Sequence, residues 1–509
     1  MRDNTGLEVQ RTFSGGVTVR TERDRFGREV RKSVRAGGIE RGAYRYEWGI
    51  ANRLLAKENE LTGTLMRYDY DRFDFLIRQE TTDGSETDVI YRVPDFVGNL
   101  FETPEKKDRK YGPGGRLLED PDSFYHYDDE GNLVFREFKE LQNNGVPHDR
   151  KRMEKERGIR CRATGTGWLY EWASNGMLKK VVRPDGRPVE FRYDALGRRT
   201  AKQYFGKVTR WVWDGNVPLH EWCYKAIGMQ SDEEKNTPPK EPADDITTWV
   251  FEAGTFVPAA KIQDGKQYSI VSDYLGTPIQ MYDGQGNKTW DCTLDIYGKV
   301  LVVDKGTEFD CPFRFQGQYE DEETGLYYNR FRYYLPNFGG YISQDPINLK
   351  GGIKFYSYVS NPTIWLDILG LFHHNDTGFY VYGLFDIIDI DEKGQFIFAD
   401  TPYYIGITNN LPVRASQHRA SGRLGKNNYM RPLEEKVTYG QARGYEQAYI
   451  EYYGTKTGII NEKISAVNRG NKINSFDIDN TTRARDRHQC FTENRENKLN
   501  ELASKDKHH

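Results

Sequence analysis

The feature that most constrains this chain is a repeated pattern of short β-type segments. Through residue 300, an aromatic–x–aromatic triplet is followed by a polar turn with Gly or Asp, and then by alternating apolar residues. Tyr46, Tyr68 and Tyr91 recur with a period in the low twenties, and Tyr170 and Tyr193 repeat the same spacing. This period accommodates one β-hairpin with its connections, so the pattern predicts a stacked, mostly β array.

Composition agrees with strands and tight turns in a polar chain. Aromatic residues make up 14% of the sequence, 50 residues are Gly, and the mean hydropathy is −0.81. A length of 509 residues exceeds one ordinary core and predicts two or three domains. The N-terminus has no apolar signal core and no run approaches the length of a membrane span. The cysteines are odd in number, scattered and never in CxxC spacing, which predicts synthesis in a reducing cytoplasm.

The repeat at 193–202, "YDALGRRTAK", carries a more specific signal. It resembles the YD-repeat, or Rhs, family, whose hallmark is "YDxxGR". The resemblance implies that residues 1–311 form a large hollow β-shell of hairpins that encloses a C-terminal polypeptide. The repeats taken alone are equally compatible with an open β-solenoid that has no cargo.

The segment 312–371 begins "PFRFQGQYEDEETGLYYNRFRYY" and ends "DILGL". It is similar, nearly end to end, to the Rhs core-associated segment that closes the shell. In the family, this segment ends in a DPxGL motif, after which an aspartyl-type self-cleavage frees a variable toxin. The resemblance therefore places the scissile bond between Leu371 and Phe372, and makes 372–509 the released domain.

Self-cleavage of this type needs two carboxylates, one protonated and one ionised, around one peptide bond. Asp345 in "SQDP" and Asp367 in "DILGL" match the family positions. Gly340 stands where the family has Arg, and Ile368 stands where it has Pro. The missing Arg carries more weight, because a nearby guanidinium would hold one carboxylate ionised. The alternative is that both Asp residues only form turns.

The repeats stop after Leu371, and the tail has a different pattern. Residues 379–408 predict an antiparallel, hairpin-rich sheet. A helix is expected to begin near Pro412, with Asn410 as a possible cap, and a second helix to span 441–454. Residues 401–509 carry 18 Lys and Arg against 12 Asp and Glu, so this small α+β domain suits a polyanionic partner.

The order of motifs in the tail resembles the GIY-YIG nuclease family. The residues that match its site are Tyr382 in "VYG", Tyr404 in "YIG", Arg414 and His418 on the first helix, Glu446 on the second, and Asn461 after it. Asn468 is a rival for the last position. The first Gly of the family motif is Tyr380 here, and the interval between the two tyrosines is long, which we assign to an extended hairpin.

These residue types suit hydrolysis of a phosphodiester. Glu446 is a hard oxygen donor for a single Mg²⁺ or another divalent cation, which prefers few carboxylates and many waters. By resemblance, Tyr382 would help deprotonate the attacking water, for which a nearby cation must lower its pKa. Arg414 can grip two phosphate oxygens at once. Tyr404 and His418 would orient phosphate or water.

Each of these residues also has a purely structural interpretation. Tyr382 and Tyr404 could be core aromatics, Arg414 and His418 solvated helix positions, Glu446 a first-turn carboxylate, and Asn461 a turn residue. We favour the nuclease because all the features occur in order.

The sequence thus predicts an antibacterial effector made in a bacterial cytoplasm and delivered into the cytoplasm of a target cell. Its expected partners are DNA or RNA, a cognate immunity protein and a secretion apparatus. A structural or adhesive shell with an inactive passenger is the alternative.

Overall fold

The computed structural model divides the chain into two compact units, Met1–Leu371 and Phe372–His509, here called the repeat unit and the tail unit. The residues it describes are 1–2, 8–25, 27–49, 53–71, 75–95, 98–142, 144–225, 242–346, 355–359, 361–371, 379–392, 395–408, 411–437, 439–459, 462, 464–465, 467–472, 474–475 and 485–505. None of the helices within these ranges combines the length and the apolar character needed to cross a membrane.

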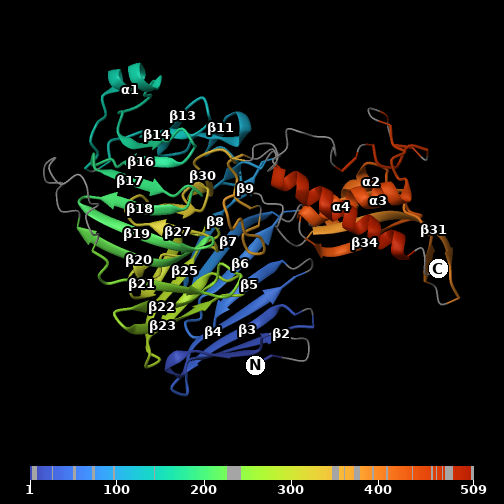
Figure 1. Ribbon diagram of the computed structural model, residues 1–509, viewed down its shortest axis with the longest axis horizontal. Helices are drawn as coiled ribbons and strands as arrows, with labels where there is room; N and C mark the ends of the chain where they lie inside the picture. Colours follow the sequence, from blue (N-terminus) through green and yellow to red (C-terminus); the bar gives the residue numbers. More distant parts are fainter. Residues whose placement is uncertain are drawn as a thin grey trace. The chain divides into compact units, whose positions relative to one another are not determined.

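The repeat unit contains two large sheets in which every strand pairs with the next along the chain, in antiparallel fashion (Figure 1). The first sheet comprises β1 (Gln10–Thr12), β2 (Thr18–Arg23), β3 (Glu29–Ala36), β4 (Ile39–Trp48), β5 (Leu54–Asn59), β6 (Leu65–Tyr70), β7 (Leu76–Asp83) and β8 (Glu86–Tyr91). A two-stranded sheet, β9 (Val93–Pro94) and β10 (Leu100–Phe101), follows it.

The second sheet has sixteen strands and runs from β11 to β26. Its strands are β11 (Lys110–Tyr111), β12 (Leu117–Glu119), β13 (Ser123–Tyr127), β14 (Leu133–Phe138), β15 (Gly167–Trp172), β16 (Leu178–Val182), β17 (Pro188–Tyr193), β18 (Arg199–Tyr204), β19 (Lys207–Asp214), β20 (Val217–Lys225), β21 (Thr247–Phe251), β22 (Pro258–Gln263), β23 (Lys266–Ser272), β24 (Pro278–Tyr282), β25 (Lys288–Leu294) and β26 (Val300–Lys305). A short helix, α1 (Arg150–Arg157), lies between β14 and β15. The 3₁₀ turns are η1 (Ser14–Gly16), η3 (Pro113–Gly115) and η4 (Glu308–Asp310).

The "YDxxGR" turns owe their geometry to the Asp and the Gly. The Asp194 carboxylate accepts hydrogen bonds from the backbone N–H groups of Leu196 and Arg198, both at 2.9 Å. Gly197 has a φ of 74°, a left-handed conformation that glycine adopts without a steric penalty. The Asp194 carboxylate thus accepts from the N–H groups of the turn, which stabilises a short turn.

At two of these turns, the tyrosine before the turn ties one hairpin to the preceding strand. Tyr193 donates from its hydroxyl to the carbonyl of Leu178, and Tyr70 donates to the carbonyl of Leu54, both at 2.7 Å. The strand register shifts immediately before each of these two tyrosines. The bulge turns the ring along the sheet, so the period in the sequence reflects a repeated side-chain-to-backbone bond as well as a repeated hairpin.

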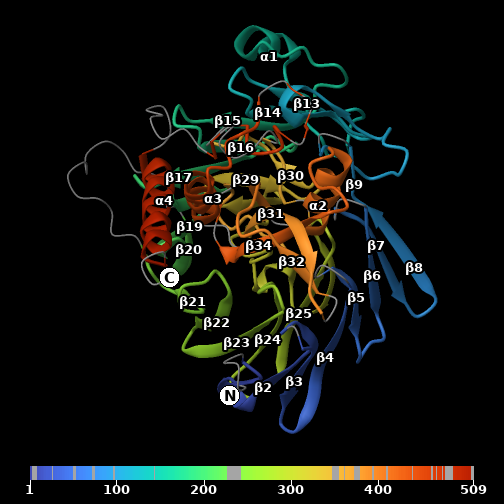
Figure 2. The same cartoon turned by 90° about the vertical axis from the view of Figure 1, so that its right-hand side faces the viewer.

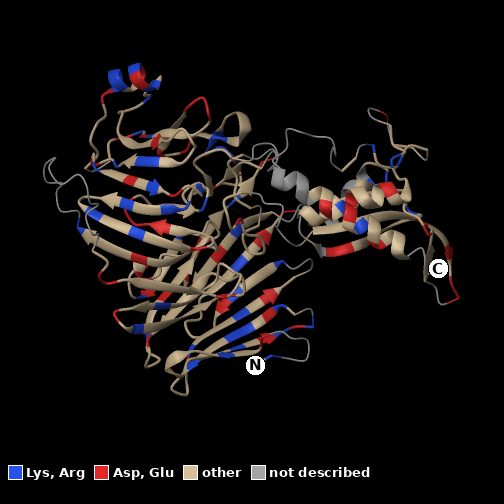
Figure 3. Ribbon diagram, in the orientation of Figure 1, with Lys and Arg blue, Asp and Glu red and all other residues tan. Residues whose placement is uncertain are grey.

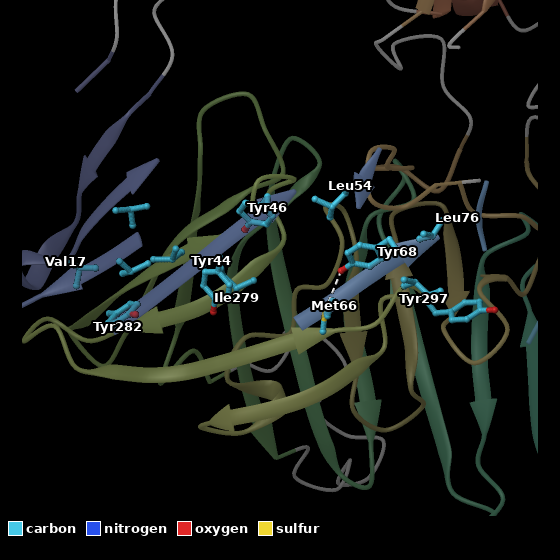
Figure 4. Close-up of a cluster of buried hydrophobic side chains, with 14 of the residues drawn as sticks. Val17, Tyr44, Tyr46, Leu54, Met66, Tyr68, Leu76, Ile279, Tyr282 and Tyr297 are labelled. Carbon is cyan, nitrogen blue, oxygen red and sulfur yellow. Dashed lines mark hydrogen bonds between the residues drawn. The ribbon is translucent and has the colours of Figure 1, made fainter. Parts of the chain in front are cut away.

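The first large sheet packs its apolar face against β23 and β24, near the end of the second. Tyr44 and Tyr46 of β4 lie in one cluster with Ile279 and Tyr282 of β24 (Figure 4). Strands from distant parts of the sequence therefore share a core. Mostly β architecture, as the sequence predicts, is confirmed for this unit.

A small four-stranded sheet packs on the second large sheet. Its strands are β27 (Tyr319–Asp321), β28 (Leu326–Asn329), β29 (Arg332–Leu335) and β30 (Gly340–Tyr341). Tyr328 and Tyr333 of this sheet lie in one cluster with Val181 and Phe191. The core-associated segment therefore adds buried aromatic residues to the array.

The tail unit is a four-stranded antiparallel sheet with helices. The strands are β31 (Phe379–Ile390), β32 (Phe396–Phe398), β33 (Tyr404–Thr408) and β34 (Asn428–Val437), and the helices are α2 (Leu411–Ala420), α3 (Tyr439–Tyr453) and α4 (Arg485–Lys505). β31 pairs with the other three strands. Figure 2 shows this unit from another side.

Alternation along the strands assigns the helices to the faces of this sheet. Val381 and Ile405 share a cluster with residues of α3 and α4, whereas Tyr382 shares a cluster with residues of α2 and the segment after it. The sequence missed β34, because its mixed polar composition gives no clear period, and also α4. The predicted cap Asn410 lies outside the described residues.

Candidate active site

The repeat unit brings the two predicted cleavage carboxylates to one guanidinium. Nη2 of Arg332 lies 3.1 Å from Oδ2 of Asp367 and 3.5 Å from Oδ2 of Asp345. All three side chains are buried. Tyr341 donates from its hydroxyl to Asp367 Oδ2 at 2.8 Å, and the Arg332 guanidinium stacks on the Tyr341 ring at 3.6 Å. The arrangement concentrates one positive charge between two acids.

The same cluster holds the chain immediately before the predicted scissile bond. The Leu371 N–H donates to Asp367 Oδ1 at 2.8 Å. Nε of Arg332 donates to the carbonyl of Gly370. Asn329 donates to the backbone carbonyl of Asp367 at 2.8 Å. Leu371 is thus fixed against the acid pair, while Phe372 lies outside the described residues.

Burial is the main cause that raises the pKa of Asp367, and Arg332 and the Tyr341 hydroxyl act in the opposite direction. A raised pKa favours the protonated acid, which is the form that one carboxylate of such a pair must take. The sequence argued against cleavage because the Arg of the family pattern is Gly340 here. In the structure, Arg332 places a guanidinium beside both carboxylates. A Cβ at Gly340 would lie 2.7 Å from the carbonyl oxygen of Tyr356, so this backbone leaves no room for a side chain there.

In the tail unit, three of the predicted nuclease residues form one cluster. The hydroxyl of Tyr382, on β31, lies 2.7 Å from Nε2 of His418, on α2. The ring of Tyr404, at the start of β33, lies 5.1 Å from the His418 ring and 6.3 Å from the Tyr382 ring. Tyr382 and His418 are buried, and Tyr404 is partly exposed.

The glycine of "YIG" is required by this packing. Gly406 is paired with Tyr382 across the two strands. A Cβ on Gly406 would lie 2.3 Å from the Tyr382 hydroxyl. The absence of a side chain therefore lets the tyrosine lie across the neighbouring strand toward His418.

The electrostatics of the cluster favour neutral side chains. Burial, followed by the charges of Arg423 and Arg414, lowers the pKa of His418 to about 4. Burial, followed by Tyr404, raises the pKa of Tyr382, and the two arginines only partly offset this. Neutral imidazole donates at one ring nitrogen and accepts at the other, so the tautomer of His418 sets the direction of its hydrogen bond with the Tyr382 hydroxyl.

Glu446 lies on α3, near these groups, and is buried. Its Oε2 accepts a hydrogen bond from the hydroxyl of Ser475 and lies 3.6 Å from Nη1 of Arg443. Burial is the largest cause that raises the pKa of Glu446, while Arg443, Ser475 and Arg414 lower it. Arg414, on α2, donates to the carbonyl of Ile407 at 3.4 Å. The positive charge of Arg414 therefore acts on the Glu446 carboxylate.

Neither asparagine that the sequence proposes for the last site position is placed at the site by the described residues. Asn461 lies outside the described residues. Asn468 bonds locally, with Oδ1 accepting from the Ser465 N–H at 2.7 Å. Asn471 instead clamps the YIG strand: Oδ1 accepts from the Ile405 N–H at 2.9 Å, and Nδ2 donates to the Ile405 carbonyl at 2.7 Å. The sequence missed Asn471, because "NKIN" offers several asparagines and no spacing rule to choose among them.

The long interval between the two tyrosines is the extended hairpin that the sequence predicts. β32 pairs with the outer half of β31. The hairpin region is acidic, as Figure 3 shows at its far end, and its described Asp and Glu residues are Asp386, Asp389, Asp391, Glu392 and Asp400. Negative charge here repels a polyanion, so a polyanion is favoured on the side of the arginines.

Family models match two stretches of the repeat unit. The model described as Teneurin YD-shell matches residues 241–362, and the model described as RHS Repeat matches residues 174–209. These matches, with the relatives below, support the Rhs/YD-repeat family that the sequence resembles.

Two curated relatives match about three quarters of this chain. The chain is 30% identical over 414 residues to "Double-stranded DNA deaminase toxin A" of Burkholderia cenocepacia (strain H111), which covers 76% of this chain and 26% of the relative. It is 28% identical over 384 residues to "Probable deoxyribonuclease RhsA" of Dickeya dadantii (strain 3937). The matched region covers 72% of this chain and 24% of the relative. The chain thus spans about a quarter of the length of these relatives.

Among solved structures, the crystal structure of TcdB2–TccC3 without its hypervariable C-terminal region is similar over 72% of this chain and 21% of that chain. The sequence identity is 19% and the TM-score is 0.36.

Proposed function

We propose that the tail unit is a divalent-metal-dependent endonuclease of the GIY-YIG type, which acts on the DNA of a target cell. The observation that carries the proposal is the contact of Tyr382 with His418 beside Tyr404. Tyr382, Tyr404 and His418 come from β31, β33 and α2, which is the order of the family motifs. If these residues only packed a core, they would not need to occur in the order of the family motifs. Nor would they need Arg414 on the same helix as His418.

The side chains divide the work as follows. Arg414 binds the phosphate through two N–H groups and offsets the negative charge that develops on its oxygens. His418, neutral at physiological pH, shares a hydrogen bond with the Tyr382 hydroxyl and so orients the tyrosine toward the attacking water. Tyr404 borders the same space and positions the phosphate or the water. The burial of the pair keeps bulk water away from the hydrogen bond.

Glu446 fits a single bound Mg²⁺. Among the described residues, its only hydrogen bond is from Ser475 to Oε2, which leaves Oε1 available. No group of three or more His, Cys, Asp and Glu that could hold a metal occurs in the described part of the chain. Mg²⁺ is commonly held by one carboxylate with waters and substrate phosphates. When bound, the ion would polarise the phosphate and stabilise the leaving oxygen.

We further propose that the chain cleaves itself after Leu371 and so frees the tail unit. In this hydrolysis, water adds its hydroxyl to the Leu371 carbonyl carbon, the C–N bond breaks, and the Phe372 nitrogen takes the proton. Asp367, whose pKa is raised by burial, supplies the acid, and Asp345 beside Arg332 takes the proton of the water. The bonds of Asp367 and Arg332 to Leu371 and Gly370 support this assignment.

The family supports the biological setting. We propose that the shell encloses the tail unit, that a secretion apparatus delivers the protein from the producer's cytoplasm into a competitor, and that an immunity protein protects the producer. One relative is named a "tRNA3(Ser)-specific nuclease" and is 27% identical over 183 residues, so RNA is the second candidate substrate.

The proposal is tested by incubating the purified chain with supercoiled plasmid or with total cellular RNA, in Mg²⁺ or in EDTA. Nicking of plasmid in Mg²⁺ but not in EDTA is the expected result. Cleavage of RNA alone would replace the substrate. No cleavage of either nucleic acid by the tail freed from the shell would favour a shell with an inactive passenger.

A further inference from the structure

Arg423 is a second arginine at the proposed nuclease site, and it is held at four points. Its N–H donates to the carbonyl of His418 at 2.9 Å, and its own carbonyl accepts from the Tyr403 hydroxyl at 2.7 Å. Its Nε donates to the carbonyl of Arg469 at 3.1 Å. Its guanidinium carbon lies 4.4 Å from the centre of the Tyr404 ring. Backbone and side chain are therefore both fixed.

The fixed guanidinium keeps its two terminal nitrogens available. Among the described residues, Nε carries the only hydrogen bond of the Arg423 side chain, and no carboxylate lies within ion-pair distance of it. Four of the five guanidinium N–H donors therefore have no partner in the described part of the chain. The side chain is only partly exposed. An oriented, unneutralised cation is the form in which arginine recognises phosphate.

Arg423 and Arg414 act on the same central pair. Both charges lower the pKa of His418, and both oppose the rise in the pKa of Tyr382. Arg414 precedes His418 on α2, whereas Arg423 follows the helix in the turn closed by the His418 carbonyl. Two guanidiniums from different segments thus border one reaction centre.

We infer that Arg423 binds a backbone phosphate next to the one that Arg414 holds for cleavage, so the site takes a polynucleotide strand with at least two consecutive phosphates. This inference rests on the proposed nuclease function. Tyr404 beneath the guanidinium fixes the plane of the fork, and the Arg469 carbonyl fixes its rotation. A polynucleotide has a phosphate for each of the two arginines, whereas a small phosphodiester has a single phosphate and can bind only one of them.

The test is the salt dependence of DNA binding by the full-length chain in EDTA, where cleavage is absent. A short fluorescent DNA duplex is the probe, and the dissociation constant is measured between about 50 and 200 mM salt. Each phosphate contact contributes about 0.9 to the slope of log affinity against log salt. Arg423→Gln is expected to lose about 0.9 from this slope, and Arg423→Lys to retain the slope. A smaller fraction of folded molecules shifts the intercept, whereas the loss of one phosphate contact changes the slope.

Arg431→Gln is the matched control. Arg431 also stacks on an aromatic ring, at 4.6 Å from the centre of Phe385, but it is exposed on β34. We expect its slope to equal that of the wild type. An unchanged slope in Arg423→Gln, an equal loss in Arg431→Gln, or no DNA binding by the wild type would each overturn the inference.

The two proposals fail separately. If Mg²⁺ produces no cleavage but the Arg423→Gln slope still falls, the phosphate site stands and the nuclease function is wrong. If the plasmid is cleaved and the slope does not change, the nuclease function stands and the Arg423 assignment is wrong.

Discussion

The Tyr382 hydroxyl lies 2.7 Å from Nε2 of His418, and the two residues are 36 positions apart in the sequence. β31 supplies the tyrosine and α2 supplies the histidine. Gly406 leaves the space through which the tyrosine reaches the histidine. This hydrogen bond joins β31 to α2, and the burial of both side chains keeps them neutral.

His418 predicts a loss of stability in acid. Its pKa is lowered by burial from 6.5 to about 4 in the folded chain, so between these values the unfolded chain binds more protons. The stabilising contribution is complete above pH 6.5 and is lost as the pH falls toward about 4. The difference corresponds to about 3 kcal/mol. Thermal melting of the tail unit across this range measures it.

His418→Gln is the matched variant, because glutamine can still accept from the Tyr382 hydroxyl without titrating. The melting temperature of this variant should change less than that of the wild type between neutral and acid pH. An identical fall in both proteins would mean that other groups, and not His418, cause the acid sensitivity.

Asp367→Asn should prevent self-cleavage. Asparagine keeps the hydrogen bond from the Leu371 N–H but cannot donate a carboxyl proton. The wild type is expected to give a separate tail fragment, 372–509, that stays with the repeat unit on purification. The variant should run as one 59.2 kDa band on a denaturing gel. A single band for the wild type as well would refute self-cleavage.

Arg332→Gln should also abolish cleavage, because it removes the guanidinium that the two buried carboxylates share. Breaking a buried ion pair in this way typically costs about 3–5 kcal/mol, so near-ultraviolet circular dichroism must accompany the gel. Adding Gly340→Arg restores the residue of the family pattern but should not rescue cleavage, since its Cβ would lie 2.7 Å from the Tyr356 carbonyl. Rescue by that second substitution would show that Arg332 is not the required guanidinium.

Asn471→Ala should destabilise the tail unit by about 1–3 kcal/mol, because it leaves the buried N–H and carbonyl of Ile405 without their partner. Urea unfolding of the tail transition measures the effect. If activity were lost while stability stayed at the wild-type value, Asn471 would act in the reaction and not in the scaffold.

The sequence predicted what local chemistry determines. Strands and turns of the repeat unit follow from Asp and Gly at fixed offsets, as at Asp194 and Gly197, and from aromatic residues that bond to the preceding strand, as at Tyr193. The meeting of β4 with β24 was not predictable, because no residue in either strand specifies a partner so far away along the chain.

The same distinction holds at the sites. Tyr382, Tyr404 and His418 could be named from an ordered motif. Arg332 and Arg423 could not, since each depends on contacts between segments that the sequence does not relate. Only the folded structure shows that Arg332 lies beside Asp345 and Asp367, and that Arg423 lies over the ring of Tyr404.

The most direct test of the nuclease assignment is the toxicity and Mg²⁺-dependent plasmid nicking of three variants. Glu446→Ala removes the proposed metal carboxylate, and Arg414→Ala removes the phosphate contact. Each should reduce the nicking rate on the order of 10²–10³-fold, which corresponds to about 3–4 kcal/mol of transition-state stabilisation. Arg419→Ala, an exposed arginine one residue after His418, should stay near the wild-type rate. Equal loss in Arg419→Ala and Arg414→Ala, with both proteins folded by circular dichroism, would contradict the assigned site.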